Sequence, residues 1–154
     1  MRVFKFGGAS VKDADGIKNV YDVLQKVGYE DVLLVVSAMG KTTNALEDVI
    51  KNYFEKSEEL NSSVQEVKKY HNQILLDLFE DEKNEVFAAV NALFSELEYF
   101  LAHNKSPNYN FVYDQIVSYG ELISTTILSH FMNFMGIKTQ WLDVRNYIKT
   151  NSNY

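Results

Sequence analysis

The chain has 154 residues, of which 46% are hydrophobic and 14% aromatic; this is enough for one domain with a packed core and excludes a disordered protein. Its net charge of −6 argues against a nonspecific nucleic-acid surface, and the absence of cysteine excludes disulfides and thiolate zinc sites. No apolar run approaches the roughly 18–20 residues that cross a bilayer, and no signal peptide precedes the first strand-like segment, so we expect a cytoplasmic protein.

The first 36 residues carry the pattern of a parallel strand–helix–strand unit. Residues 2–6 form an apolar strand, and helical spacing over 17–27 ends at Gly28, a residue typical of helix C-termini. The run 31–36 is apolar on both faces, as in a strand buried within a parallel sheet. The loops that follow the two strands then meet at the carboxyl edge of the sheet, where ligands bind in open α/β folds.

Helices with little chemistry are predicted over residues 44–103. Asn44 with Glu47 suits the N-terminus of one helix, and Ser62 with Gln65 forms a capping box ahead of a second. From Ser62 onward, two apolar stripes separated by a short polar joint favour an antiparallel helical hairpin.

The chain breaks at 104–108, which holds the single proline, and a short helix follows. A longer helix is predicted over 121–135, ending at Gly136. Residues 137–144 look like a third strand, which gives a thin, mostly parallel sheet in an α/β fold.

The three histidines are too widely separated to pair as metal ligands. Each is expected on a helix flank or at a helix end: His71, His103 and His130.

Lys5, Gly7 and Gly8 form the first candidate site, at the end of the first strand. Glycines allow backbone N–H groups to approach an anion, and the lysine adds a positive charge, so the turn suits a phosphate. The plainer alternative is a surface lysine beside a tight turn. Neither a P-loop nor a dinucleotide-binding glycine motif is present.

Two further segments have both a functional and a structural interpretation. Ser37 and Thr43 lie between the second strand and a helix, where hydroxyls and free N–H groups suit a carboxylate or simply cap the helix. Glu121 follows Gly120 and stands three residues after Ser118, so it either binds an ammonium group in a pocket or completes a capping box.

Taken together, four segments resemble the aspartate kinases of the amino-acid kinase family. They are KFGGAS at the start, VSAMGKTTN after the second strand, SYGELIST at a helix, and QWLDVRNYIKT over 140–150. Ala9 stands where the family usually has threonine. The resemblance implies a three-layer αβα kinase fold with a helical hairpin insertion, and a product that is 4-phospho-L-aspartate, made from ATP and aspartate on the route to lysine, threonine and methionine.

The same resemblance implies a role for each motif residue. Lys5 would neutralise the transferred phosphoryl group of ATP, and Gly7 and Gly8 would contact the phosphates through their N–H groups. Ser37 would lie at the reaction centre, Thr43 would bind aspartate, and Glu121 would hold its α-ammonium group. Asp143 and Arg145 are expected to be structural, so we leave them out of this site.

The resemblance also implies that residues 1–154 are the amino-terminal lobe of a kinase domain about twice this length, with a helical segment at about 44–103. In relatives, the segments for adenosine and Mg²⁺ and the regulatory domains follow the matched region. We therefore expect this chain to be inactive alone and to form a homo-oligomer. Two alternatives are a related kinase acting on another carboxylate or a nucleotide, and a non-catalytic module that docks through the helical hairpin.

Overall fold

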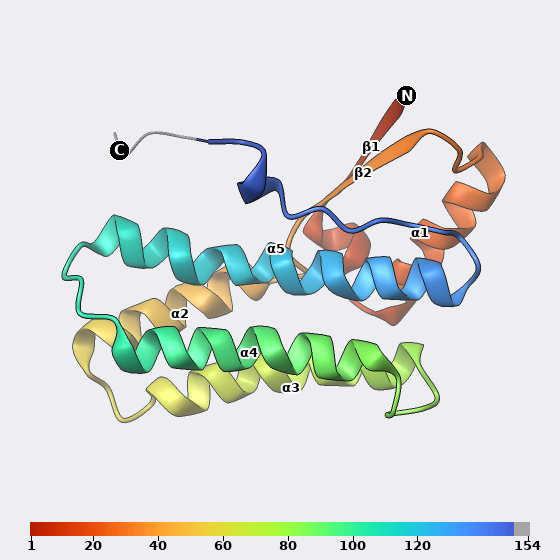
Figure 1. The fold of residues 1–154 in the computed structure, drawn as a ribbon. Coiled ribbons are helices and arrows are strands. Elements are labelled where there is room, and N and C mark those ends of the chain that lie inside the picture. The colour runs from red at the N-terminus through yellow and green to blue at the C-terminus, as the bar shows by residue number, and fades with distance from the viewer. Residues whose placement is uncertain (150–154) are drawn as a thin grey trace.

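The structure is a computed structural model that describes residues 1–149, and it combines a small parallel sheet with a layer of long helices (Figure 1). Strands β1 (Arg2–Phe6) and β2 (Val32–Val36) pair in parallel, with Phe6 opposite Val36. Helix α1 (Ala14–Val27) connects them after a short 3-10 turn, η1 (Gly8–Val11). The predicted strand–helix–strand unit is confirmed.

The two faces of this sheet differ, because successive strand residues point to opposite sides. Phe4 and Leu34 pack against the hydrophobic core. On the opposite face, Val3, Leu33 and Val35 are 58%, 41% and 46% exposed. The prediction that the second strand is buried on both faces is therefore wrong for residues 1–149. Within these residues, the face with Val3, Leu33 and Val35 is left uncovered.

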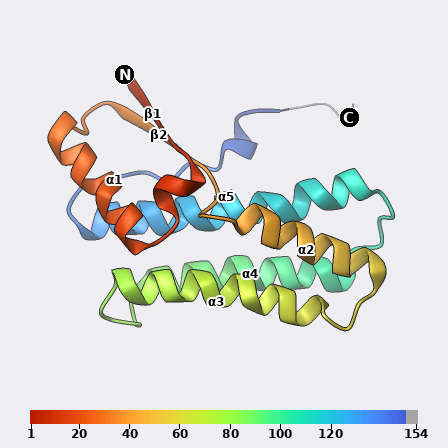
Figure 2. The ribbon, with the colours of Figure 1, turned by 180° about the vertical axis from the view of Figure 1, so that it is seen from behind.

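Four further α-helices follow β2 in the described residues. They are α2 (Thr42–Glu55), α3 (Leu60–Leu78), α4 (Glu85–His103) and α5 (Tyr109–Phe134). Helix α2 packs on α3 and α5, and α4 packs on α5 and α3. Figures 1 and 2 show the α3–α4 pair on the side of α2 and α5 that lies away from the sheet. None of the helices in residues 1–149 is long and apolar enough to span a membrane.

The predicted helical hairpin is confirmed as α3 and α4. Its apolar stripes are buried, including Val67 and Leu75 of α3 and Val90 and Phe94 of α4. They pack on α2 and α5 rather than on the sheet. Because these stripes are used inside the core, they offer no exposed apolar surface of the kind that a docking module needs.

Two predicted helix starts are wrong by three residues, since the N-caps are Lys41 and Glu59 instead of Asn44 and Ser62. Helix α2 begins at Thr42, so Asn44 is inside it, because the carbonyl of Met39 accepts bonds from both the N–H group (3.0 Å) and the hydroxyl (2.6 Å) of Thr42. Helix α3 begins at Leu60, and the Ser62 hydroxyl donates to the carbonyl of Glu59 at 2.8 Å instead of capping the helix.

The prediction of two helices, a short one after residue 108 and a longer one over 121–135, is also wrong, because α5 runs without interruption from Tyr109 to Phe134. Ser118 does not cap a new helix; its hydroxyl donates to the carbonyl of Gln115 at 2.9 Å, inside the helix. The predicted end is confirmed to within two residues, and Gly136 takes a positive φ of 87° just beyond it. The capping-box interpretation of Glu121 is thereby excluded.

Residues 137–143 do not form the predicted third strand. They run back along α5 (Figure 1), held to it by side chains instead of by pairing with β2. The Asn133 side chain accepts from the Thr139 N–H group at 2.9 Å, and the Trp141 indole donates to the Thr125 hydroxyl at 2.9 Å. In residues 1–149 the sheet thus has two strands.

Candidate functional site

The loops that follow β1 and β2 meet at the carboxyl edge of the sheet, as the strand–helix–strand pattern predicts. The Ser37 N–H group donates to the carbonyl of Phe6 at 3.0 Å, which extends the strand pairing by one residue. Beyond it, the Gly40 N–H group donates to the carbonyl of Gly8, also at 3.0 Å. These two bonds join the loops backbone to backbone.

Glycine is required at both ends of this contact, at Gly8 by the close approach of the loops and at Gly40 by its backbone conformation. A Cβ atom on Gly8 would lie 2.7 Å from the carbonyl oxygen of Ala38, which is well inside van der Waals contact. Gly40 has a φ of +55°, a conformation that strains residues with a side chain. Glycine at these positions therefore sets the spacing of the two loops.

The Lys5 side chain is exposed and lies over the turn that follows β1. Its Nζ atom is 3.9 Å from the point where a Cβ atom on Gly7 would stand. Among residues 1–149, no acceptor pairs with the N–H groups of Gly7 and Gly8 or with the Lys5 ammonium. An ammonium beside two open N–H groups is a suitable environment for an anion.

The two neighbouring threonines at the start of α2 have different environments. Thr42 is buried and its hydroxyl is bonded to Met39, so it has a structural role. Thr43 is only half-buried, as is Ser37, and neither hydroxyl has a bonding partner within residues 1–149. Both predicted hydroxyls are thus at the loop surface and accessible to a ligand.

Glu121 comes to this loop from the middle of α5. Its Oε1 atom accepts a hydrogen bond from the Ala38 N–H group at 3.2 Å. One turn further on, the Ser124 hydroxyl donates to the carbonyl of Ser37 at 2.9 Å. Gly120 permits this approach, because a Cβ atom there would be 2.9 Å from Cβ of Ala38. The three predicted segments therefore meet in one place.

Asp143 and Arg145 lie in and beside a short 3-10 turn, η2 (Val144–Asn146), and pair with each other. Two guanidinium nitrogens of Arg145 bond the Asp143 carboxylate at 2.6 to 3.1 Å. These bonds hold the pKa of Asp143 below its ordinary value. The pair suits the predicted structural role. Across residues 1–149, no three acidic or histidine side chains come together as a metal site.

Two residues of α3 lie next to the site: Tyr70, which the sequence analysis did not single out, and His71, which it did not connect with the site. The prediction of a helix-flank position is wrong for His71, which is fully buried, with Nε2 3.4 Å from the Thr42 hydroxyl and Nδ1 2.8 Å from the carbonyl of Val67. Burial lowers its pKa to about 4. His103 does end α4, and His130 lies partly buried on the flank of α5, as predicted.

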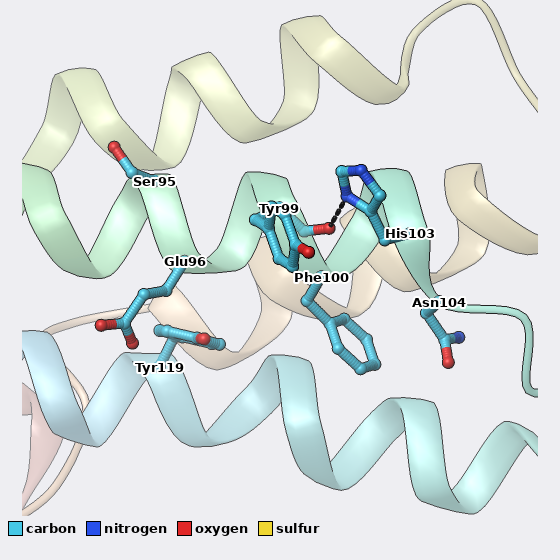
Figure 3. A pocket seen from close by; sticks show the side chains of 7 residues that line it. All are labelled: Ser95, Glu96, Tyr99, Phe100, His103, Asn104 and Tyr119. Carbon is cyan, nitrogen blue, oxygen red and sulfur yellow. Dashed lines mark hydrogen bonds between the residues drawn. The ribbon is translucent and has the colours of Figure 1, made fainter.

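A separate open groove lies between α4 and α5, lined by Tyr99, Phe100 and His103 of α4 and by Tyr119 of α5 (Figure 3). The Tyr99 and His103 rings stack at 4.0 Å. The groove contains none of the predicted site residues, so it is distinct from the site at the sheet edge.

Comparison with known proteins agrees with this fold and this arrangement of loops. Residues 1–153 match the profile of the amino acid kinase family, so the chain belongs to that family. The resemblance to aspartate kinases is confirmed. The chain is 28% identical over 148 residues to bifunctional aspartokinase/homoserine dehydrogenase 2 of Escherichia coli K12, covering 96% of the chain and 18% of that protein. It is 31% identical over 148 residues to aspartokinase 1 of Arabidopsis thaliana, covering 92% and 25%.

A solved structure, E. coli aspartokinase III in complex with aspartate and ADP (R-state), superposes with a TM-score of 0.84 at 25% identity. The superposition covers 100% of this chain and 33% of that one. The predicted α/β class is confirmed. The chain thus spans between about a sixth and a third of the lengths of the relatives it matches.

Proposed function

We propose that this chain forms the aspartate-binding part of an aspartate kinase. The observation that carries the proposal is the meeting of the Lys5 turn, the Ser37 loop and Glu121 at one edge of the sheet. In the reaction, an oxygen of the aspartate side-chain carboxylate forms a bond to the γ-phosphorus of ATP. The bond from that phosphorus to the bridging oxygen breaks, and ADP leaves with the electron pair.

Lys5, Gly7 and Gly8 bind the phosphoryl group in this proposal. The side-chain carboxylate is already a nucleophile, so catalysis depends on bringing two anions together and neutralising their charge. The Lys5 ammonium supplies a mobile positive charge, and the open N–H groups of Gly7 and Gly8 supply fixed donors to phosphate oxygens. Lys5 is the catalytic residue among them because it contacts the transferred group.

Ser37, Thr43 and Glu121 bind aspartate. The hydroxyls of Ser37 and Thr43 donate to its carboxylates, and Glu121 accepts from its α-ammonium group. One oxygen of Glu121 is bonded to Ala38, and the other has no partner within residues 1–149. The complex of E. coli aspartokinase III with aspartate and ADP, on a similar fold, supports this choice of ligands.

The adenosine-binding and Mg²⁺-binding parts are proposed to lie outside this chain. Across residues 1–149, no three acidic or histidine side chains come together as metal ligands, so no such cluster favours this lobe as the place where Mg²⁺ binds. Mg²⁺ would accompany the ATP phosphates and offset their charge. We propose that residues 1–154 are the amino-terminal lobe of the kinase domain and that this lobe alone is inactive. The share of its relatives that it covers supports both statements.

Self-association and a cytoplasmic location remain predictions. The exposed sheet face with Val3, Leu33 and Val35 supports association, because a contiguous apolar face is stabilised by burial. Light scattering of the complete protein that carries this sequence measures the association directly.

A substrate panel on that complete protein tests the proposed function. ADP release with ATP and aspartate is expected, with far less release when glutamate, acetate or a nucleoside monophosphate replaces aspartate. Greater release with one of those acceptors would support the alternative of a related kinase with another substrate. Detectable aspartate-dependent release by residues 1–154 alone would contradict the incomplete-site part of the proposal.

A further inference from the structure

We propose that Tyr70 is a positioning residue that holds the two loops of the site at a fixed spacing. The inference rests on the proposed function, and it assigns a role to the helical hairpin, which otherwise carries no site residue. Tyr70 lies on α3, in the part of the chain where the sequence offers no distinctive motif.

The Tyr70 hydroxyl reaches both loops at once. It donates a hydrogen bond to the carbonyl of Lys12, the residue that directly follows the turn after β1. The same oxygen lies 2.6 Å from the point where a Cβ atom on Gly40 would stand, in the loop after β2. A single hydroxyl therefore touches the first loop at Lys12 and the second at Gly40.

These contacts lie next to the backbone bond that joins the loops. The Gly40 N–H group donates to the carbonyl of Gly8, and the Tyr70 hydroxyl lies against Gly40. Tyr70 therefore packs on one of the two residues that form this bond. If the phosphate donors are in the first loop and the aspartate hydroxyls are in the second, the spacing of the loops sets the distance between nucleophile and phosphorus. Small errors in that distance reduce turnover strongly.

Neighbouring packing keeps the tyrosine in place. Its ring meets the buried His71 ring edge to face at 5.0 Å, and Tyr70 as a whole residue is 36% exposed. Burial and the nearby Asp13 carboxylate raise the pKa of Tyr70, so the hydroxyl stays protonated and able to donate.

The test compares Tyr70→Phe with Tyr53→Phe in the complete protein. Tyr53 is a matched control, since its hydroxyl also donates to a backbone carbonyl, that of Asn104, at 3.0 Å, at the opposite end of α2 from the site. Loss of one neutral hydrogen bond corresponds to a change of roughly three- to tenfold. In Tyr70→Phe, the amide exchange rate of Gly40 should rise by about three- to tenfold, and kcat/KM should fall by about the same factor. In Tyr53→Phe, both the exchange rate and kcat/KM should stay within about twofold of the wild-type values.

Equal effects of the two variants on Gly40 exchange would overturn the positioning role. The exchange measurement needs no substrate, so it stays valid even if the complete protein shows no aspartate-dependent turnover, a result that would contradict only the proposed function.

A double-mutant cycle with Gly40→Ala isolates the contact. The new methyl group would clash with the Tyr70 hydroxyl oxygen at 2.6 Å. The ring carbon that carries this oxygen lies at 3.5 Å, an ordinary contact distance, so removing the hydroxyl removes the clash. Backbone strain at Gly40 is the same in both backgrounds. The fold-loss in kcat/KM caused by Gly40→Ala should therefore be several times smaller in the Tyr70→Phe protein. Equal fold-losses in the two backgrounds would overturn the contact.

Discussion

The carboxylate of Glu121 accepts a hydrogen bond from the Ala38 N–H group at 3.2 Å, and this bond joins the middle of α5 to the loop after β2. Glu121 therefore has a structural contact with the loop in addition to its proposed role of binding the aspartate ammonium group. The two roles are separable, because Glu121→Gln keeps an acceptor for Ala38 and removes the negative charge that an ammonium group requires.

Glu121→Gln should therefore raise the KM for aspartate on the order of tenfold, nearly as much as Glu121→Ala, since the charge-assisted bond is lost in both. Steady-state kinetics on the complete protein measure it, with the exposed Glu66→Gln as control. If Glu121→Gln behaves like the wild type and only Glu121→Ala is impaired, Glu121 acts as a loop support and not as the ammonium site.

Lys5→Ala should lower kcat on the order of a hundredfold and leave the fold intact, because the exposed side chain contributes charge rather than packing. ADP release measures turnover, and circular dichroism confirms the fold. Lys26→Ala, at an exposed lysine in the last turn of α1, serves as control. Near-normal turnover of Lys5→Ala would contradict its catalytic role.

Gly120→Ala should destabilise the protein by about 1 kcal/mol, although alanine normally favours a helix. The added methyl group would lie 2.9 Å from Cβ of Ala38, and the cost of overpacking exceeds the gain in helix propensity. Ser118→Ala, in the same helix, should change stability by less than about 0.5 kcal/mol, since Ser118 caps nothing. Urea unfolding measures both; a Gly120→Ala protein more stable than wild type would mean that the helix and loop are not in tight contact.

His71 should make folding sensitive to acid. Burial lowers its pKa from about 6.5 to about 4, so the folded protein binds fewer protons than the unfolded chain between these values. The contribution of the buried neutral His71 to the free energy of unfolding is nearly complete above pH 6.5. It is lost as the pH falls toward 4, by about 2 kcal/mol between pH 7 and pH 5.

Replacing the histidine tests this assignment. His71→Leu should remove that part of the pH dependence, whereas His103→Gln, at an exposed histidine with a similar bond to its own helix, should not. Unfolding free energies at the two pH values provide the comparison. An unchanged pH dependence in His71→Leu would mean that another group titrates over this range.

The meeting of the three motif segments could be predicted better from the sequence than the bounds of the helices could. Lys5, Ser37 and Glu121 belong to segments whose residue types already suit an anion, a carboxylate and an ammonium group, and the strand–helix–strand pattern places two of them at one sheet edge. That Glu121 joins them came from the resemblance, because local spacing explained it equally well as a cap.

Errors arose where tertiary contacts override local signals. Ser118 and Glu121 have capping-box spacing, yet α5 continues through them because Gly120 allows the helix to pack directly on the loop. Residues 137–143 are apolar enough for a strand, but Thr139 and Trp141 bond to α5 instead. The sequence did not connect Tyr70 or His71 with the site, since their contacts are with loops about 30 residues or more away along the chain.

The most direct test of a single shared site is a crystal structure of the complete protein with aspartate and an ATP analogue. We expect the aspartate ammonium group within hydrogen-bond distance of Glu121, and the side-chain carboxylate between the Ser37 loop and the Lys5 ammonium. Aspartate bound with neither Glu121 nor Ser37 within that distance would contradict it.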